Sequence, residues 1–450
     1  MREFDVVVIG AGSAGEAAAG RLGQNGVSVA IVEDRLVGGE CSYFACMPSK
    51  ALLRPVDLTN EARRVPGVIV GPLDAPAVLA RRDEVIADLD DSGQLPWLEE
   101  RNVTLIRGRG RLEGERRVRV GDEVLGARTA VIVATGSTPL VPAIPGLRES
   151  HPWTNIEATT AKHVPASLLI LGGGVVGVEM AQAWSALGSQ VTLVHRGERL
   201  IEREEPFAGD QVREGLADSG VDVRLRVSAV RVAGGDGLFA VDLDDGTTIE
   251  GESLLAAFGR EPTTADIGLE TLGLEAGGHL RVDEALRVPG RAWLYAVGDV
   301  NGRALLTHMG KYQGRIAADV IRGKPARLRS DGAGSPRVIF TDPQVGAVGF
   351  TLAGAQEAGL DVRFVDVPTS GNAGGSFVGR GAPGTSRIVV DERRRVVVGA
   401  TISGAEVAEA LHAATVAVVG EVALDDLWHA VPSFPTRSEL WLKLLESYGL

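Results

Sequence analysis

The chain has 450 residues with a formal net charge of −13, and two of the residues are cysteines. The negative charge argues against nucleic acid and anionic membrane lipid as partners, because both would repel the chain. Two cysteines in this length exclude a secreted disulfide framework, and we expect a cytoplasmic protein whose cysteines are catalytic or bind a metal. With 59 glycines and 4% aromatic residues, the composition is typical of an α/β protein of about three domains.

The first predicted unit spans residues 4–33, FDVVVIGAGSAGEAAAGRLGQNGVSVAIVE. An apolar strand leads into a Gly10-x-Gly12-x-x-Gly15 turn, an Ala-rich helix, and a second strand that ends at Glu33. A glycine turn between strand and helix lets backbone N–H groups and the helix N-terminus hold a pyrophosphate. Because Glu33 can accept a hydrogen bond from a ribose hydroxyl, we predict a dinucleotide-binding βαβ unit.

Both cysteines lie in residues 39–50, GECSYFACMPSK. On an ideal helix, Cα atoms five residues apart are about 8.6 Å from each other, which exceeds the roughly 7 Å limit for a disulfide. A bond between Cys41 and Cys46 therefore requires a break in the helix, and Gly38-Gly39 and Pro48 are residues that permit one. Two buried apolar cysteines are the alternative, but these flanking residues favour a redox pair.

A second copy of the βαβ pattern follows at residues 168–195, LLILGGGVVGVEMAQAWSALGSQVTLVH. A shift of 162 positions, from 10 to 172, aligns both strands and all three glycines without a gap. One such glycine motif is a weak signal, but two copies in the same strand and helix context indicate two dinucleotide sites. The glycines of the second copy are Gly172, Gly174 and Gly177.

The two copies differ at the end of the second strand. Glu33 in the first copy would repel a 2′-phosphate, whereas His195 and the following Arg196 would attract one. We therefore predict two different dinucleotides, with NADPH favoured at the second site and NADH still possible.

The cysteine stretch, read as GGECSYFACMPSK, resembles the redox-active segment of the class I pyridine nucleotide-disulfide oxidoreductases. This family includes glutathione reductase, dihydrolipoamide dehydrogenase and mercuric reductase. Further segments resemble the family in the expected order: VIVATGSTP at 131–139, AFGREPT at 257–263, LYAVGDV at 294–300 and PRVIFTDPQVGAVGFT at 336–351. The resemblance implies an α/β fold with two Rossmann-like domains, for FAD and NAD(P), and an α+β dimer-interface domain.

The family layout implies domain boundaries and a homodimer. The FAD-binding domain would comprise residues 1–145 and 283–332, the NAD(P)-binding domain 146–282, and the interface domain 333–450. The chain would bind FAD and NADPH, and a small-molecule electron acceptor would complete the reaction.

The resemblance also implies roles for single residues. Cys41 would attack the substrate, and Cys46 would lie next to the flavin as a thiolate. Lys50 would lie near the flavin N5 edge and pair with Glu179, and Glu439 would belong to the C-terminal catalytic motif. FAD contacts would come from Gly10, Gly12, Gly15, Glu33, Lys50, Gly110, Ala134, Thr135, Gly136, Gly298, Asp299 and His308. Contacts with the pyridine nucleotide would come from Gly172, Gly174, Gly177, Glu179, His195, Arg196 and Gly259.

The C-terminal motif departs from the family pattern. The family has His-Pro-Thr-x-x-Glu, in which the His is the acid-base catalyst, and this chain has Phe434 in place of the His before Pro435, Thr436 and Glu439. Phe cannot exchange a proton, so an acid-base contribution of roughly 10²–10⁴-fold is lost unless another group supplies it. His429, five residues upstream, is one candidate.

Three functions therefore stay open. The favoured one is an NADPH-dependent FAD oxidoreductase whose acceptor is a metal ion, a quinone or a specialised disulfide. The second is a dihydrolipoamide dehydrogenase or low-molecular-weight disulfide reductase with a substitute acid-base group. The third is a flavin-binding interaction subunit that has lost its redox turnover.

Overall fold

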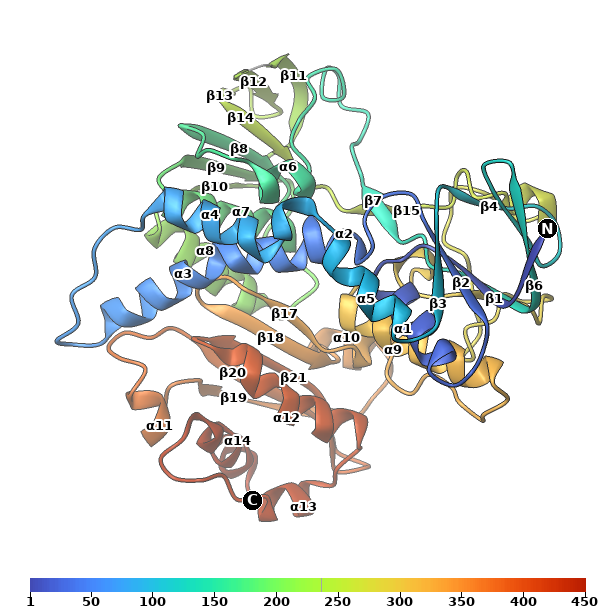
Figure 1. Cartoon of the computed structure of the whole chain (residues 1–450). Coiled ribbons are helices and arrows are strands. Elements are labelled where there is room, and N and C mark those ends of the chain that lie inside the picture. The colour runs from blue at the N-terminus through green and yellow to red at the C-terminus, as the bar shows by residue number, and fades with distance from the viewer. Residues whose placement is uncertain (236) are drawn as a thin grey trace. The chain divides into compact units, whose positions relative to one another are not determined.

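A computed structural model describes residues 1–235 and 237–450 (Figure 1). The chain divides into two compact units. The first unit comprises Met1–Pro48, Asp83–Leu140 and Gly259–Gly332. The second unit comprises Ser49–Arg82, Val141–Phe258 and Ala333–Leu450. Both units combine helices with sheets, so the predicted α/β class is confirmed. The predicted boundaries of three domains stay a prediction.

The first unit is built on a seven-stranded sheet with the order β3-β2-β1-β6-β5-β4, in which β16 also pairs with β6. Its parallel strands are β1 (Arg2–Ile9), β2 (Val29–Glu33), β3 (Val103–Arg107), β6 (Glu123–Val133) and β16 (Leu294–Ala296). Its antiparallel strands are β4 (Gly110–Leu112) and β5 (Arg117–Val120). Alternate residues of β1 enter different apolar clusters, Val6 and Val8 in one and Val7 and Ile9 in the other. Both faces of the sheet are therefore buried, as the continuous apolar run in β1 requires.

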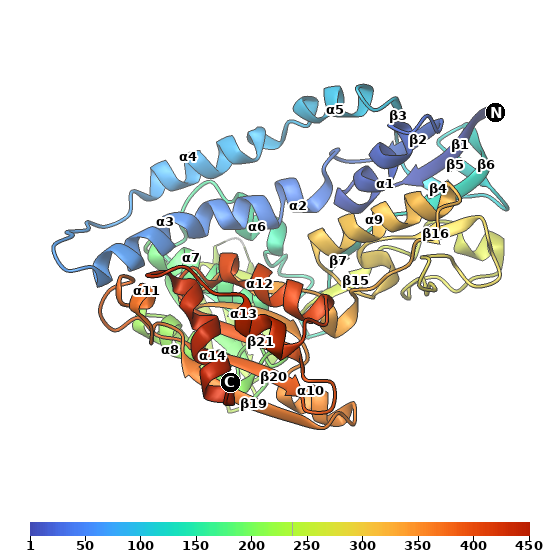
Figure 2. The same ribbon diagram turned by 90° about the horizontal axis from the view of Figure 1, so that it is seen from below.

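Helices and short strands complete the first unit. The predicted helix of the first βαβ unit is present as α1, which packs against α9 (Figure 2). β7 and β15 form a separate two-stranded ribbon. The elements are α1 (Ser13–Gly23), α2 (Gly39–Tyr43), the start of α3 (Cys46–Arg64), α5 (Leu95–Glu99), β7 (Ser137–Pro139), β15 (Arg260–Pro262) and α9 (Thr307–Ile321).

The second unit contains the second predicted βαβ unit in a four-stranded parallel sheet with the order β10-β9-β8-β14. Alternate residues of β8 enter opposite apolar clusters, so this sheet is also covered on both faces. The strands are β8 (Ser167–Leu171), β9 (Gln190–His195), β10 (Asp222–Leu225) and β14 (Ser253–Ala256). The helices are α6 (Asn155–Thr160), α7 (Val175–Ala186) and α8 (Pro206–Asp218), and α4 (Ala75–Val85) begins in this unit. A three-stranded ribbon consists of β11 (Ala229–Gly235), β12 (Leu238–Leu243) and β13 (Thr248–Gly251).

The C-terminal part of the second unit is a five-stranded antiparallel sheet with the order β17-β18-β21-β20-β19. Helices α12 (Val407–Val419) and α14 (Leu440–Tyr448) pack on it (Figure 2). The charged turn in residues 386–402 predicts a hairpin, and β20 and β21 form it. The strands are β17 (Arg337–Ile339), β18 (Gln344–Gly349), β19 (Val362–Pro368), β20 (Thr385–Asp391) and β21 (Val396–Gly404). The remaining helices are α10 (Leu352–Glu357), α11 (Ala373–Ser376) and α13 (Leu424–His429).

Two features are absent from residues 1–235 and 237–450. No helix in these ranges has both the length and the apolar character that a membrane span requires. Within the same ranges, no three His, Cys, Asp or Glu side chains come together in a way that could hold a metal ion.

Candidate active site

The two glycine turns have the same backbone geometry. The first glycines, Gly10 and Gly172, have φ values of +103° and +119°, in a region that side chains other than that of Gly adopt rarely. A Cβ atom on Gly15 or Gly177 would overlap the carbonyl oxygen of the first glycine of its own turn. Each turn can therefore pack this closely on its helix only because both positions lack a side chain.

The helix N-termini behind these turns are open to a ligand. Gly12 and Gly174 precede α1 and α7, and neither helix has a side-chain cap on its first N–H groups. An added Cβ on Gly174 would meet nothing within 4 Å, and one on Gly12 would meet only the Cα atom of Gly39, at 4.0 Å. Uncapped N–H groups facing open space are what a pyrophosphate needs. The residues present at each turn therefore fit the pyrophosphate of a dinucleotide such as FAD or NAD(P)H.

Glu33 and His195 occupy equivalent ends of β2 and β9 and accept equivalent hydrogen bonds. The carboxylate Oε2 of Glu33 accepts one from the Ala11 N–H, with an N···O distance of 2.7 Å. The Nδ1 atom of His195 accepts one from the Gly173 N–H, with an N···N distance of 3.1 Å. Both side chains are therefore turned toward their glycine turns, where the adenosine ribose of a dinucleotide would lie.

The hydrogen bond to His195 decides the charge of this ring. Because Nδ1 accepts, the proton of the ring is on Nε2, which lies 3.9 Å from Oε2 of Glu202. Burial lowers the pKa of His195, so the ring is neutral at pH 7. The exposed Arg196 is then the cation of the predicted phosphate-binding pair, and the attraction of a 2′-phosphate by charge depends on Arg196 rather than on both residues.

The two cysteines lie on different helices, so the predicted break in the helix is confirmed. Cys41 belongs to α2, and Cys46 is the first residue of α3. Between the helices, Phe44 has a non-helical backbone with φ −132° and ψ 2°. Tyr43 and Phe44 are buried, and the Gly38 N–H donates to the carbonyl of Ala11 in the first glycine turn, with an N···O distance of 2.8 Å. This segment is therefore fixed beside the N-terminus of α1.

The structure has both cysteines as thiols, and their surroundings favour a thiolate at Cys41. A hydrogen bond with Cys46 lowers the pKa of the Cys41 thiol to about 6, against the opposing effect of burial. The hydroxyls of Thr307 and Ser13 and the ammonium of Lys311 act in the same direction as Cys46. The Cys46 Sγ atom lies 3.3 Å from the Thr307 Oγ1 atom. Since the thiolate is the nucleophile, Cys41 is suited to attack a substrate at neutral pH.

Alkylation should reveal this thiolate directly. We expect iodoacetamide to modify Cys41 at a rate that reaches half of its maximum near pH 6, whereas an ordinary cysteine does so near pH ~8.5. Mass spectrometry of the Cys41 peptide over a pH series measures this rate. In the Cys46→Ala variant, which has no hydrogen-bond donor at this position, the midpoint should move to higher pH, because the hydrogen bond that contributes most to the effect is gone. Equal midpoints near 8.5 in both proteins would contradict the assignment.

Lys50 and Glu179 form the predicted ion pair in the second unit. The Lys50 Nζ atom is 2.7 Å from Oε2 of Glu179. The other carboxylate oxygen of Glu179 accepts a hydrogen bond from the Phe340 N–H at 3.0 Å, and the Lys50 ammonium lies 4.7 Å from the centre of the Phe340 ring. Glu179 is 3% exposed, so this buried carboxylate is fully paired. The proposed roles of both residues toward the flavin stay a prediction.

The predicted FAD contacts of the first unit gather at one edge of its sheet. The parallel register pairs Ile9 with Val32 and with Val133, and Val133 with Ala296. The carboxyl ends of β1, β2, β6 and β16 therefore meet, which is where ligands bind in such sheets. The residues that follow these strands are Gly10, Ala134, Thr135, Gly136, Gly298 and Asp299. Elsewhere in this unit, Gly110 begins β4, Gly259 precedes β15, and His308 is the exposed second residue of α9.

Sequence reasoning missed a polar network around Asp299. Its carboxylate accepts a hydrogen bond from the Ser137 Oγ atom at 2.6 Å. The guanidinium of Arg260 donates to the same Ser137 Oγ atom at 2.7 Å and forms an ion pair with Glu40. Glu40 is the neighbour of Cys41, so the network connects the cysteine helix to the predicted flavin-binding Asp299. Arg260 lies within the AFGREPT segment, which was the only sequence signal for it.

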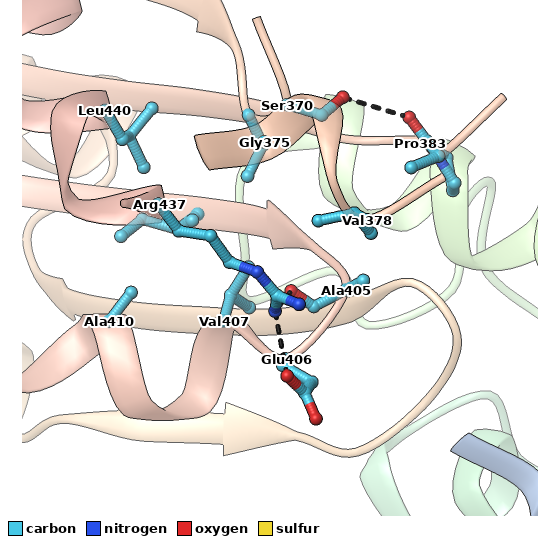
Figure 3. Close-up of a pocket in the computed structure, with 13 residues that line it drawn as sticks. Ser370, Gly375, Val378, Pro383, Ala405, Glu406, Val407, Ala410, Arg437 and Leu440 are labelled. Atoms are coloured by element: carbon cyan, nitrogen blue, oxygen red, sulfur yellow. Dashed lines mark hydrogen bonds and ion pairs between the residues drawn. The ribbon is translucent and has the colours of Figure 1, made fainter. Parts of the chain in front are cut away.

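The C-terminal segment is held by contacts within the second unit (Figure 3). Arg437 forms ion pairs with Glu406, at 2.9 Å, and with Glu61 of α3, at 2.8 Å. The Glu439 carboxylate accepts a hydrogen bond from the Gly374 N–H, with an N···O distance of 3.2 Å. The adjoining cavity has a volume of about 30 Å³, which suits one or two water molecules rather than a substrate. Glu439 thus has a structural contact, and a catalytic role for it stays a prediction.

Phe434 and His429 both lie on the surface of the second unit. The Phe434 side chain is 77% exposed. His429 is the exposed last residue of α13.

The arrangement as a whole defines a class of protein: a redox enzyme with two dinucleotide sites and a dithiol. The pyridine nucleotide-disulphide oxidoreductase family matches residues 4–314, and its dimerisation domain matches residues 335–444. The chain belongs to this family, whose members use FAD and NAD(P)H.

Three relatives illustrate the range of the match. A glutathione reductase of Burkholderia cepacia is 32% identical over 98% of this chain and 98% of the relative. A mercuric reductase of Staphylococcus aureus is 28% identical over 97% of this chain and 81% of the relative. Among solved structures, the HOCl-induced flavoprotein disulfide reductase RclA of Escherichia coli matches with a TM-score of 0.87 and 25% identity, over 98% of this chain and 99% of that one.

Proposed function

We propose that the chain is an NADPH-dependent FAD oxidoreductase that passes electrons through Cys41 and Cys46 to an acceptor other than a simple dithiol. The observation that carries the proposal is the cysteine pair of Cys41 and Cys46, fixed beside the first glycine turn, in a chain with Phe434 at the position of the family's acid-base His. When bound, FAD supplies two-electron transfer from the nicotinamide to the cysteine pair. The uncapped turn at Gly12 would hold its pyrophosphate, and Glu33 would hold its ribose.

The acceptor is a metal ion, a quinone or a specialised disulfide. Electron transfer to a metal ion or a quinone would not need the proton transfer that Phe434 cannot perform. Two relatives support a metal ion: the mercuric reductase already described, and the E. coli flavoprotein disulfide reductase, which has also been solved as a Cu(II) complex. A redox-vestigial subunit is disfavoured, because the chain retains both cysteines of the pair and the ion pair of Lys50 with Glu179.

An anaerobic titration of the yellow holoprotein with NADPH tests the proposal. We expect a long-wavelength absorbance band that arises from the Cys46 thiolate next to the oxidised flavin. Addition of copper(II), a benzoquinone or a disulfide should then remove the electrons and abolish the band. Bleaching of the flavin without such a band would mean that the cysteines do not share the electrons, and the proposal would be wrong.

The preference for NADPH depends on Arg196. We expect Arg196→Ala to weaken NADPH binding about tenfold, the usual loss for one charge-assisted contact with a phosphate, and to leave NADH binding nearly unchanged. Stopped-flow reduction of the flavin at varied nucleotide concentration gives both dissociation constants. Arg213→Ala is the matched control, since Arg213 is an exposed arginine of α8 in the same unit. Equal effects on NADPH and NADH would contradict a phosphate contact.

We also infer a homodimer. The chain has the family's dimerisation domain at residues 335–444. Large apolar side chains are exposed on that part of the second unit, and burying them would favour association. These side chains are Phe377 (71% exposed), Val416 (53%), Val431 (82%) and Phe434 (77%).

A further inference from the structure

Helices α1 and α9 approach each other closely beside the cysteine pair. Figure 2 shows them side by side in the first unit. A Cβ atom on Gly310 would meet the Ala14 Cβ atom at 3.2 Å, and one on Gly314 would meet the Ala18 nitrogen at 3.0 Å. Glycine at both positions thus lets the two helices touch. Polar side chains at the edge of this contact are therefore held near one another.

Each helix presents a hydroxyl and then a charged residue toward the cysteines. Thr307 on α9 lies with its Oγ1 atom 3.3 Å from the Cys46 Sγ atom, and the hydroxyls of Ser13 on α1 and of Thr307 both lower the pKa of the Cys41 thiol. Glu16 follows Ser13 by three residues, and Lys311 follows Thr307 by four. Residues three or four apart lie on the same helix face, with Cβ atoms roughly 5–6 Å apart. Glu16 and Lys311 therefore stand one helical turn beyond the hydroxyls of Ser13 and Thr307.

Glu16 has the properties of a proton-exchange group. It is half-buried, and within the part of the chain that the structure describes its carboxyl has no hydrogen bond and no ion pair within 4.0 Å. Burial raises its pKa to about 7. Lys311 of α9 opposes this shift, while negative charge at Cys41 of α2 and at Glu33 of β2 adds to it. A carboxyl that titrates near neutral pH can both donate and accept protons during turnover.

We propose that Glu16 is the acid-base residue of Cys41 and takes over the task that Phe434 cannot perform, so that the acceptor is a disulfide. This inference rests on the proposed function, because it requires the reduced cysteine pair. Lys311 would be a positioning residue, whose positive charge favours the Cys41 thiolate.

The chemistry starts from the pair reduced at the expense of NADPH. The Cys41 thiolate attacks one sulfur of the substrate disulfide, so that a mixed disulfide forms and the substrate S–S bond breaks. The leaving thiolate takes the proton of Glu16. Glu16, now ionised, takes the proton of the Cys46 thiol, and the Cys46 thiolate attacks the Cys41 sulfur, which forms the Cys41–Cys46 disulfide and releases the second substrate thiolate. Glu16 passes this proton to the second thiolate, and the substrate has gained two electrons and two protons.

Glu16→Gln tests the proposal with two probe disulfides. For 2-hydroxyethyl disulfide, whose leaving alkyl thiolate needs a proton, we expect turnover to fall about 10²–10⁴-fold. For 5,5′-dithiobis(2-nitrobenzoate), whose aryl thiolate leaves without protonation, turnover should fall less than about tenfold, since a leaving thiol of low pKa departs readily. Glu99→Gln is the matched control, because Glu99 is an exposed residue at the end of α5 in the same unit.

Readouts other than turnover separate this proposal from the proposed function. In Glu16→Gln, NADPH should still produce the long-wavelength band, which shows that flavin and cysteine pair are intact. In the apoprotein, Lys311→Met should shift the alkylation midpoint of Cys41 to higher pH, whereas Lys324→Met should not. Wild-type turnover of 2-hydroxyethyl disulfide by Glu16→Gln would overturn the assignment of Glu16. If the wild-type protein forms the band but reduces only copper(II) or benzoquinone, the inference that the acceptor is a disulfide is wrong and the proposed function stands. If NADPH produces no band in the wild-type protein, the proposed function is wrong.

Discussion

Replacing Cys46 with Ser is expected to stop acceptor reduction while NADPH can still reduce the bound flavin. Without Cys46 the mixed disulfide at Cys41 cannot be resolved, and the pair cannot carry two electrons. The loss of turnover should be at least about 10³-fold, as for removal of other covalent catalytic groups. Stopped-flow spectroscopy measures the two half-reactions separately.

Cys41→Ser is the informative companion variant. It should also abolish acceptor reduction, but the remaining Cys46 thiol lies within 3.3 Å of Thr307 and keeps its place in α3. We therefore expect Cys41→Ser to show the long-wavelength band before NADPH is added, and Cys46→Ser to lack it under all conditions. Normal turnover of any acceptor by Cys46→Ser would show that electrons leave the flavin directly.

Lys50→Met is expected to lower both the stability of the protein and the rate of flavin reduction. The substitution leaves the Glu179 carboxylate buried with one remaining partner, the Phe340 N–H. Breaking a fully buried pair costs about 3–5 kcal/mol. Because the Lys50 side chain is 34% exposed, we expect a loss of about 2–3 kcal/mol in the free energy of unfolding. Urea unfolding of the apoprotein gives this value, and stopped-flow reduction by NADPH gives the rate.

The double variant Lys50→Met/Glu179→Gln separates charge from packing. A neutral Gln at position 179 can still accept the Phe340 hydrogen bond and needs no cation. The double variant should therefore be more stable than Lys50→Met alone, which is the coupling expected for residues in contact. A double variant whose loss equals the sum of both single losses would mean that the ion pair contributes nothing.

The two glycine turns are the part of this protein that the sequence alone determines. Gly10 and Gly172 each adopt a positive φ, which Gly accepts more readily than other residues. Gly15 and Gly177 let each helix pack closely against the carbonyl of the first glycine of its own turn. These are local constraints, so a pattern repeated after 162 positions was sufficient to predict both βαβ units. The break between Cys41 and Cys46 follows in the same way from the geometry of a short peptide.

Motif resemblance extended these predictions to contacts between distant residues. The Lys50–Glu179 pair joins residues 129 positions apart, and no local rule predicts it. The family pattern did so, because related chains that share a fold bring equivalent residues together. The same pattern was less informative where this chain departs from it, as at Phe434.

Only the tertiary structure decided which side chains surround the cysteines and what charge they carry. No motif in the sequence singles out Glu16 or Lys311 as functional. Arg260 is 220 positions from Glu40, with which it forms an ion pair. His195 was predicted to attract a 2′-phosphate together with Arg196, yet its hydrogen bond with Gly173 and its burial leave the ring neutral. The physical reason is the same in each case: burial and partner distance set pKa values and hydrogen bonds, and both are created when segments far apart in the chain pack together.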